Sequence, residues 1–237
     1  MNNQMTKLDK SYIILVTFFV VVLVMTNLVG MKFFQAPFTN LALTTGILTY
    51  PFTFIISDVV TEIYGKKKAN FMVYLGFTLS IFMYLVTKMM IELPPHPYWY
   101  EANNVYGYKE MLDYQKAYQS TFNVTSILIF ASMLAFLSGQ LLDVYLFQKI
   151  RQLTGGKHLW LRNNGSTMIS QLIDTLIVNS IVLYVGLHTP FLNGLEVMSS
   201  MYLYKLILCA LSTPFTYILV FFLRRQSRKE ALVSSNI

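Results

Sequence analysis

The chain has 237 residues, of which 55% are hydrophobic and only 12% charged, and its formal net charge is +7 at pH 7. This composition leaves too little polar surface to cover a soluble globule, so it excludes a water-soluble domain and indicates an integral membrane protein. The single cysteine, Cys209, excludes an intramolecular disulfide, and we interpret it as an inert thiol that packs between helices.

Six segments, taken in chain order, are apolar over about 20 residues, the length that a helix needs to cross the hydrocarbon layer. They are predicted at residues 12–31, 44–64, 71–91, 122–147, 167–187 and 201–223. The first is interpreted as a retained helix, because its apolar run is too long for a signal peptide and residues 27–30 offer no cleavage site. The sequence therefore predicts an all-α bundle of six transmembrane helices that forms a single transmembrane domain over residues 1–237.

Basic residues are concentrated on one side of this predicted bundle. They precede the first helix and follow the second, fourth and sixth: Lys7, Lys10, Lys66, Lys67, Lys68, Lys149, Arg151, Lys157, Arg162, Arg224, Arg225, Arg228 and Lys229. The positive-inside rule makes that side cytoplasmic and puts both termini there. Membrane topology and the lipid bilayer thus explain the net charge, and nucleic acid is not an expected partner.

The second predicted helix carries a polar stripe. Phe54, Asp58 and Glu62 recur at helical spacing, with Ser57 and Thr61 beside them. A carboxylate at the membrane centre costs about 2.5 to 3.5 kcal/mol, so we expect a polar cavity that compensates for it. Two other interpretations stay open: Glu62 pairs with a lysine at the cytoplasmic interface, or Asp58 forms a purely structural pair.

Two residues mark the ends of the same helix. Pro51 lies in its first turn or kinks it and frees carbonyl groups. Gly65 suits a helix C-cap, and the three lysines that follow it suit the negative end of the helix dipole.

The fourth and fifth predicted helices share a Gln-x-x-Asp pattern. Gln140 precedes Asp143 in one, and Gln171 precedes Asp174 in the other, where Ser170 comes directly before the pattern. A spacing of three residues puts each amide and its carboxylate on one helical face. The repetition is typical of an internal repeat in a transporter, although coincidence between two apolar helices is an open alternative.

Several other polar residues adjoin the predicted spans. The fifth helix is expected to be capped by Asn163, Asn164, Ser166 and Thr167. Asn27 lies near the outer end of the first helix, and Lys205 lies within the first turns of the sixth. That lysine either extends outward to the interface or neutralises one of the three aspartates.

Two longer motifs resemble those of a known family. Residues 50–69 resemble the signature of the queuosine precursor transporter family, also called the vitamin-uptake-transporter-like family: Tyr-Pro-Phe-Thr-Phe-Ile-Ile-Ser-Asp-Val-Val-Thr-Glu-Ile-Tyr-Gly-Lys-Lys-Lys-Ala. A second resemblance runs from Thr-Gly-Gly-Lys-His-Leu-Trp-Leu-Arg-Asn-Asn-Gly-Ser-Thr, at residues 154–167, to Ser-Gln-Leu-Ile-Asp-Thr at residues 170–175. The resemblance extends over nearly the whole chain.

The resemblance implies a function in queuosine salvage. Members of the family are multi-pass inner-membrane proteins that import 7-deazaguanine bases for tRNA modification. The expected substrates are 7-cyano-7-deazaguanine and 7-aminomethyl-7-deazaguanine, with queuine as a further candidate. We therefore expect a small-molecule substrate, no cofactor and no metal.

The buried carboxylates and amides suit such a base. A 7-deazaguanine presents N1–H and a 2-amino group side by side, and one carboxylate accepts both hydrogen bonds. Our hypothesis is that Asp58 or Asp174 binds this edge. Gln140 and Gln171 can each donate to the 6-oxo oxygen and accept from a ring N–H.

Aromatic and charged residues complete the expected site. Tyr50 or Phe54 can stack on the flat base, while Lys205 and the remaining carboxylates form a charge network or proton relay. The expected substrate-binding residues are Asn27, Tyr50, Phe54, Asp58, Glu62, Gln140, Asp143, Ser170, Gln171, Asp174 and Lys205.

Other classes of function fit the sequence less well. No histidine lies inside a predicted span, and the hydrolase motifs His-Glu-x-x-His and Gly-x-Ser-x-Gly are missing, so we do not expect an enzyme. A purely structural membrane subunit would not need three buried aspartates. A substrate-binding subunit that depends on a separate energising module stays open, because six short helices with a central pocket would suit it too; this sequence itself has no P-loop. A transporter of another purine-like or vitamin-like solute also stays open. The sequence also leaves open whether the protein is a homodimer.

Overall fold

The computed structural model describes residues 5–29, 32–35, 42–103, 107–108, 110–122, 126–186 and 188–235. Its helices are α1 (Lys7–Val29), α2 (Tyr50–Glu92), α3 (Pro97–Asn103), α4 (Met111–Phe122), α5 (Ser126–Leu153), α6 (Leu159–Asn179) and α7 (Phe191–Ser235). A two-stranded antiparallel sheet, β1 (Phe33–Gln35) with β2 (Ala42–Thr44), and the 3-10 helix η1 (Thr45–Leu48) connect α1 to α2. The π-helix η3 (Ser180–Gly186) continues α6.

The bundle has the surface of a membrane protein. Among the described residues, four helices are long and apolar enough to cross a membrane: Lys7–Val29, Tyr50–Glu92, Leu159–Val185 and Phe191–Glu230. Large apolar side chains cover their outer faces, including Phe18, Phe71, Phe82, Leu211, Phe215 and Phe221. These observations confirm the predicted all-α membrane bundle.

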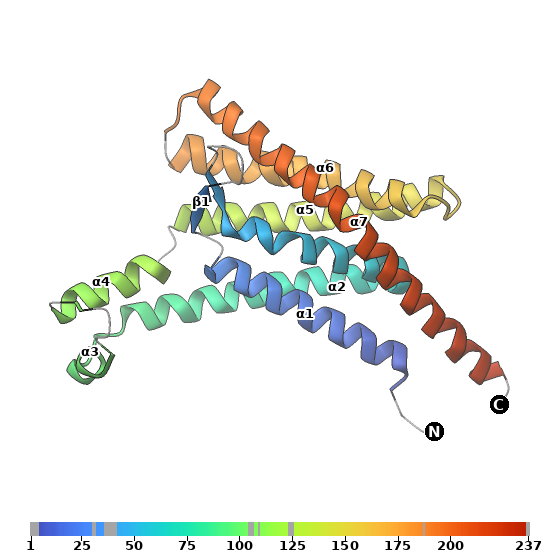
Figure 1. Ribbon diagram of the computed structural model, residues 1–237, viewed down its shortest axis with the longest axis horizontal. Helices are drawn as coiled ribbons and strands as arrows, with labels where there is room; N and C mark the ends of the chain where they lie inside the picture. The colour runs from blue at the N-terminus through green and yellow to red at the C-terminus, as the bar shows by residue number, and fades with distance from the viewer. Residues whose placement is uncertain are drawn as a thin grey trace.

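Helix α2 is folded into two legs at Gly65. This glycine has φ 83° and ψ 170°, a backbone conformation that is open essentially to glycine alone. The first leg, residues 50–64, and the second leg, residues 66–92, therefore run in opposite directions (Figure 1). Gly65 ends the first leg as predicted. Pro51 lies within the first turn of this leg, where a backbone N–H would have no acceptor within the helix, so proline costs no hydrogen bond there.

The boundaries of α6 and α7 differ from the prediction. Helix α6 begins at Leu159, after a turn in which Gly155 and Gly156 both have positive φ, and α7 begins at Phe191. The expected capping set Asn163, Asn164, Ser166 and Thr167 is wrong, because all four residues lie inside α6. Predicted spans also include residues 30–31, 123–125 and 187, which lie outside the described residues.

Apolar packing holds α1 against both legs of α2 and against α5. Phe19 and Leu23 of α1 belong to one buried cluster with Val60 of the first leg and Met72 of the second. At Gly76 the second leg comes so close to α1 that a Cβ atom would lie 2.9 Å from Leu23 Cδ2. The first leg of α2 is thus enclosed by its neighbours, which positions its polar stripe in the interior.

The two ends of the bundle differ in composition. The start of α1, the end of α7, the bend at Gly65 and the turn between α5 and α6 all lie at one end, whereas β1, α3 and α4 lie at the other (Figure 1). We call the former the basic end, because these segments contain Lys7, Lys66, Lys67, Lys68, Arg151, Lys157, Arg224 and Arg225.

Gly65→Ala should destabilise the fold, because a Cβ atom is strained in this backbone conformation at a cost of about 1 to 3 kcal/mol. The measurement is the thermal unfolding midpoint of the purified protein in detergent. Gly165→Ala is the matched control, since Gly165 lies in helical backbone and its added Cβ would meet Ile150 Cδ1 at an ordinary 3.4 Å. Equal midpoints for the two variants would contradict the role given to Gly65.

Candidate functional site

The interior of the bundle is polar where a soluble protein would be apolar. The first leg of α2, α5 and α6 bury the following polar side chains: Thr53, Ser57, Asp58, Thr61, Glu62, Gln140, Asp143, Arg162, Asn163, Ser166, Thr167, Ser170, Gln171, Asp174 and Thr175. Such groups are costly within a membrane and mark solute or ion pathways. They are arranged in three layers along the bundle.

The layer farthest from the basic end contains an ion pair beside two aromatic rings. Lys205 Nζ of α7 lies 2.5 Å from Asp174 Oδ2 of α6, and both side chains are largely buried. The same ammonium group lies 5.2 Å from the ring centre of Tyr50, whose ring is 5.7 Å from that of Phe54. Of the two arrangements considered for Lys205, the structure has the one that neutralises an aspartate.

A close approach of α5 to α6 positions this layer. At Gly139 of α5, a Cβ atom would lie 3.4 Å from Asp174 Cβ and 3.6 Å from the Ser170 carbonyl oxygen. An alanine Cβ would make ordinary van der Waals contact here, whereas a side chain larger than alanine would press on Asp174 and on the α6 backbone.

The middle layer contains a pair of carboxyl groups. Asp58 and Asp143 are each 2% exposed, and their carboxyl groups are close enough to interact. Asp143 Oδ1 accepts hydrogen bonds from Thr167 and Ser170, both at 3.2 Å. Asp58 Oδ1 and Asp143 Oδ2 have no hydrogen-bond partner within the described part of the chain. A buried carboxylate oxygen without a donor is unfavourable, so this pair is suited to receive donors from a ligand.

Amide and hydroxyl groups on the same helices are also unpaired. Gln140 Oε1, Gln171 Oε1, Ser57 Oγ and Thr175 Oγ1 are buried and make no hydrogen bond to any described residue. Each amide oxygen is an acceptor, and each hydroxyl is both a donor and an acceptor. The interior therefore offers both hydrogen-bond donors and acceptors to a polar solute.

The layer at the basic end is an ion cluster centred on Glu62. Arg162 binds this carboxylate through two hydrogen bonds, Nε to Oε2 at 3.1 Å and Nη2 to Oε1 at 2.8 Å, and is only 1% exposed. Arg224 of α7 contacts Oε1 as well, and Arg151 of α5 lies 3.9 Å from Oε2 and donates to the Glu62 carbonyl. The partners of Glu62 are thus arginines, where the sequence had suggested a lysine.

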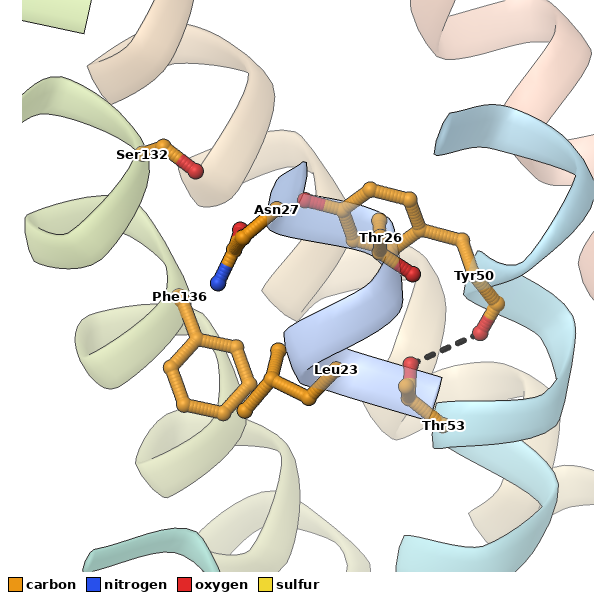
Figure 2. A pocket seen from close by; sticks show the side chains of 7 residues that line it. All are labelled: Leu23, Thr26, Asn27, Tyr50, Thr53, Ser132 and Phe136. Atoms are coloured by element: carbon orange, nitrogen blue, oxygen red, sulfur yellow. Dashed lines mark hydrogen bonds between the residues drawn. The ribbon is translucent and has the colours of Figure 1, made fainter. Parts of the chain in front are cut away.

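A small pocket lies between α1, α2 and α5, away from the basic end. It is lined by Leu23, Thr26, Asn27, Tyr50, Thr53, Ser132 and Phe136. Figure 2 shows the side chains of Asn27, Tyr50 and Phe136 around a common space, with the Thr53 hydroxyl bonded to the Tyr50 carbonyl. The pocket has room for about one water molecule, so a larger solute would require the surrounding helices to separate.

The structure brings most of the predicted site residues into these layers. Asn27 and Tyr50 share the pocket, while the other predicted residues apart from Glu62 lie in or beside the middle layer and the layer farthest from the basic end. Glu62 lies with its arginines at the basic end. The sequence analysis did not identify Arg162 or Thr167 as interior residues, because it placed Arg162 before the fifth helix and Thr167 at its first position.

The chain was compared with known protein families and sequences. Residues 44–219 match the family model described as "Putative vitamin uptake transporter". The chain is 31% identical over 179 residues to a protein of Bacillus subtilis strain 168 named "Probable queuosine precursor transporter", covering 75% of this chain and 72% of that protein. The chain belongs to the queuosine precursor transporter family. A Haemophilus influenzae protein with the same name is 28% identical over 142 residues, covering 60% of this chain and 52% of that protein. No solved structure matches the chain.

The polar layers lie almost wholly inside the matched region. Of the residues described above, Leu23, Thr26 and Asn27 in the pocket and Arg224 in the ion cluster fall outside residues 44–219. The family assignment therefore rests on the part of the chain that contains the buried carboxylates, and it agrees with the resemblance found in the sequence.

Lys205→Met should lower the stability of the protein by about 3 to 5 kcal/mol, because it leaves Asp174 buried without its cation. Adding Asp174→Asn should restore much of the loss, since an amide is far less costly to bury than an unpaired carboxylate. Thermal unfolding in detergent is the measurement, and Lys157→Met, at an exposed position in the α5–α6 turn, is the control. Losses that simply add in the double variant would show that the pair is not coupled.

Proposed function

We propose that this protein is an inner-membrane importer of 7-deazaguanine bases, such as 7-cyano-7-deazaguanine and 7-aminomethyl-7-deazaguanine, and that it is not an enzyme. The observation that carries the proposal is the pair of buried carboxyl groups, Asp58 and Asp143, with unpaired acceptor oxygens in the interior of a membrane bundle. Membership of the queuosine precursor transporter family supports the choice of solute.

The proposed topology has six crossings within one domain. The two legs of α2 cross separately, and α1, α5, α6 with η3, and α7 supply the other four. With six crossings both termini lie on the same side, together with the lysines after Gly65 and the turn between α5 and α6. The positive-inside rule then makes the basic end cytoplasmic.

Asp58 is the proposed reader of the guanine-like edge. Its Oδ1 is unpaired, whereas Asp174 is already bound to Lys205. A carboxylate that accepts from N1–H and from the 2-amino group makes two charge-assisted hydrogen bonds, which gain strength in an interior without water. The unpaired oxygens of Gln140 and Gln171 would accept from the remaining ring N–H.

Asp143 is the proposed proton-carrying partner of Asp58. Two buried carboxylates side by side repel each other unless a proton, a cation or a hydrogen-bond donor lies between them. A bound deazaguanine edge supplies such donors, and between transport events a proton can do so. This arrangement makes uptake responsive to a proton gradient.

Aromatic stacking supplies the rest of the proposed affinity. The Tyr50 and Phe54 rings are 5.7 Å apart beside the Asp174–Lys205 pair, on the same leg of α2 as Asp58. A flat base near this leg would stack on the apolar ring surface of Tyr50 or Phe54.

The first test is transport by the purified protein in liposomes. We expect saturable uptake of labelled 7-cyano-7-deazaguanine that rises with an inward proton gradient, with guanine added as the competitor. Binding without uptake would indicate a subunit that needs a separate energising module. If a vitamin-like solute were taken up and the deazaguanine were neither bound nor transported, the proposed substrate would be wrong.

Asp58→Asn should reduce binding and uptake about 10- to 100-fold, which corresponds to the loss of a charged hydrogen-bonding partner worth about 1.5 to 3 kcal/mol. Membrane abundance and unfolding midpoint should stay close to those of the unaltered protein. Asp113→Asn is the control, since that carboxylate is exposed on α4 and pairs with Lys116. Normal uptake by Asp58→Asn would remove Asp58 as the reader.

A further inference from the structure

The Glu62–arginine cluster, formed by Glu62, Arg151, Arg162 and Arg224, joins four helical segments at one level of the bundle. Glu62 comes from the first leg of α2, and the arginines come from α5, α6 and α7. The Glu62 side chain is completely buried. The other ion pairs among the described residues are simpler: Lys116–Asp113 lies within α4, and Lys205–Asp174 joins α7 to α6.

The cluster lies between the acid pair and the basic end. Glu62 is four residues beyond Asp58 on the same helix, a rise of about 6 Å toward the bend. Arg162 also donates to the carbonyl oxygens of Gly156 and Lys157, which attaches the cluster to the turn between α5 and α6. A solute or water molecule moving from the carboxyl groups to the basic end therefore has to pass this layer.

The pocket lies on the other side of the polar interior. Asn27 belongs to the end of α1, and Tyr50 and Thr53 belong to the start of α2; both segments lie in the half of the bundle nearer β1 (Figure 1). Along the first leg of α2, the order is pocket, then Asp58, then Glu62. The Glu62–arginine cluster thus fills the interior at the basic end, and the pocket described above lies toward the opposite end.

We propose that the Glu62–arginine cluster is the gate of the basic end, and that this structure shows the gate shut. The proposal rests on the proposed function only for the identity of the cargo. The arginines are buried to different extents. Arg162 is enclosed and makes two hydrogen bonds to the Glu62 carboxylate, whereas Arg224 is 51% exposed. Opening would therefore separate Arg224, and with it α7, from Glu62 while the Glu62–Arg162 pair stays intact.

A natural reporter of the open state exists in the chain. Cys209 is the single cysteine, is buried, and lies where α7 meets α6, with its Sγ 3.4 Å from Asn164 Oδ1. Removal of α7 from Glu62 would admit water, and a water-borne thiol reagent, to this seam. No change to the native sequence is needed to observe it.

The experiment measures modification of Cys209 by a charged, membrane-impermeant methanethiosulfonate added to one side of sealed vesicles of known orientation. Arg224→Gln should raise the rate at least about tenfold from the basic end and not from the opposite end, a change equivalent to about 1.4 kcal/mol in the gate equilibrium. Arg225→Gln is the matched control on the neighbouring exposed arginine, and Cys209→Ser gives the background.

Glu62→Gln should act in the same direction, and Arg224→Gln decides the result if that variant does not fold. An unchanged rate in folded Arg224→Gln would overturn the proposal, and so would an equal rise from both sides, which indicates general loosening. The assay uses no deazaguanine, so it can succeed or fail independently of the proposed substrate. With a substrate in hand, the open gate should abolish accumulation against a gradient while binding is retained.

Discussion

The cost of burying carboxyl groups within a membrane bundle governs the interior of this protein. Each buried acid must be compensated in place, and the structure does this in three different ways. Glu62 forms ion pairs with three arginines, and Asp174 forms one with a lysine. Asp143 accepts hydrogen bonds from two hydroxyl groups and lies beside Asp58. The helices are therefore held together by polar contacts at specific levels, and the apolar packing of α1 supports this arrangement from outside.

The levels are aligned because antiparallel helices present polar residues with the same period. On α6, Arg162, Ser166, Ser170 and Asp174 recur every four residues, so one stripe supplies all three layers. The first leg of α2 supplies the same layers in reverse order, and its short length is fixed by the bend at Gly65. Polar residues that recur every four positions on two antiparallel helices therefore form a row of polar sites along the bundle.

The sequence predicted the class of fold and the inward position of the aspartates, because long apolar segments and polar spacing are local signals. It did not predict the partners of Glu62. The start of the fifth helix was placed at residue 167, since Arg162 and Asn163 lower the apolar content, and this removed Arg162 from the interior. The four-residue recurrence from Arg162 to Asp174 was a usable signal. The approach of Arg224 to Glu62 was not predictable, because it depends on how α7 crosses the bundle.

The unequal compensation also separates the roles of the acids. A carboxylate that is bound by arginines or by a lysine has its charge balanced within the protein and gains little from a neutral solute. Within the described part of the chain, neither Asp58 nor Asp143 forms an ion pair with a basic side chain, and each retains an unpaired oxygen. A donor from outside the protein therefore stabilises the middle layer more than either flanking layer. That layer lies between the pocket and the Glu62–arginine cluster. A solute bound there can therefore shift the conformational equilibrium at both ends of the pathway.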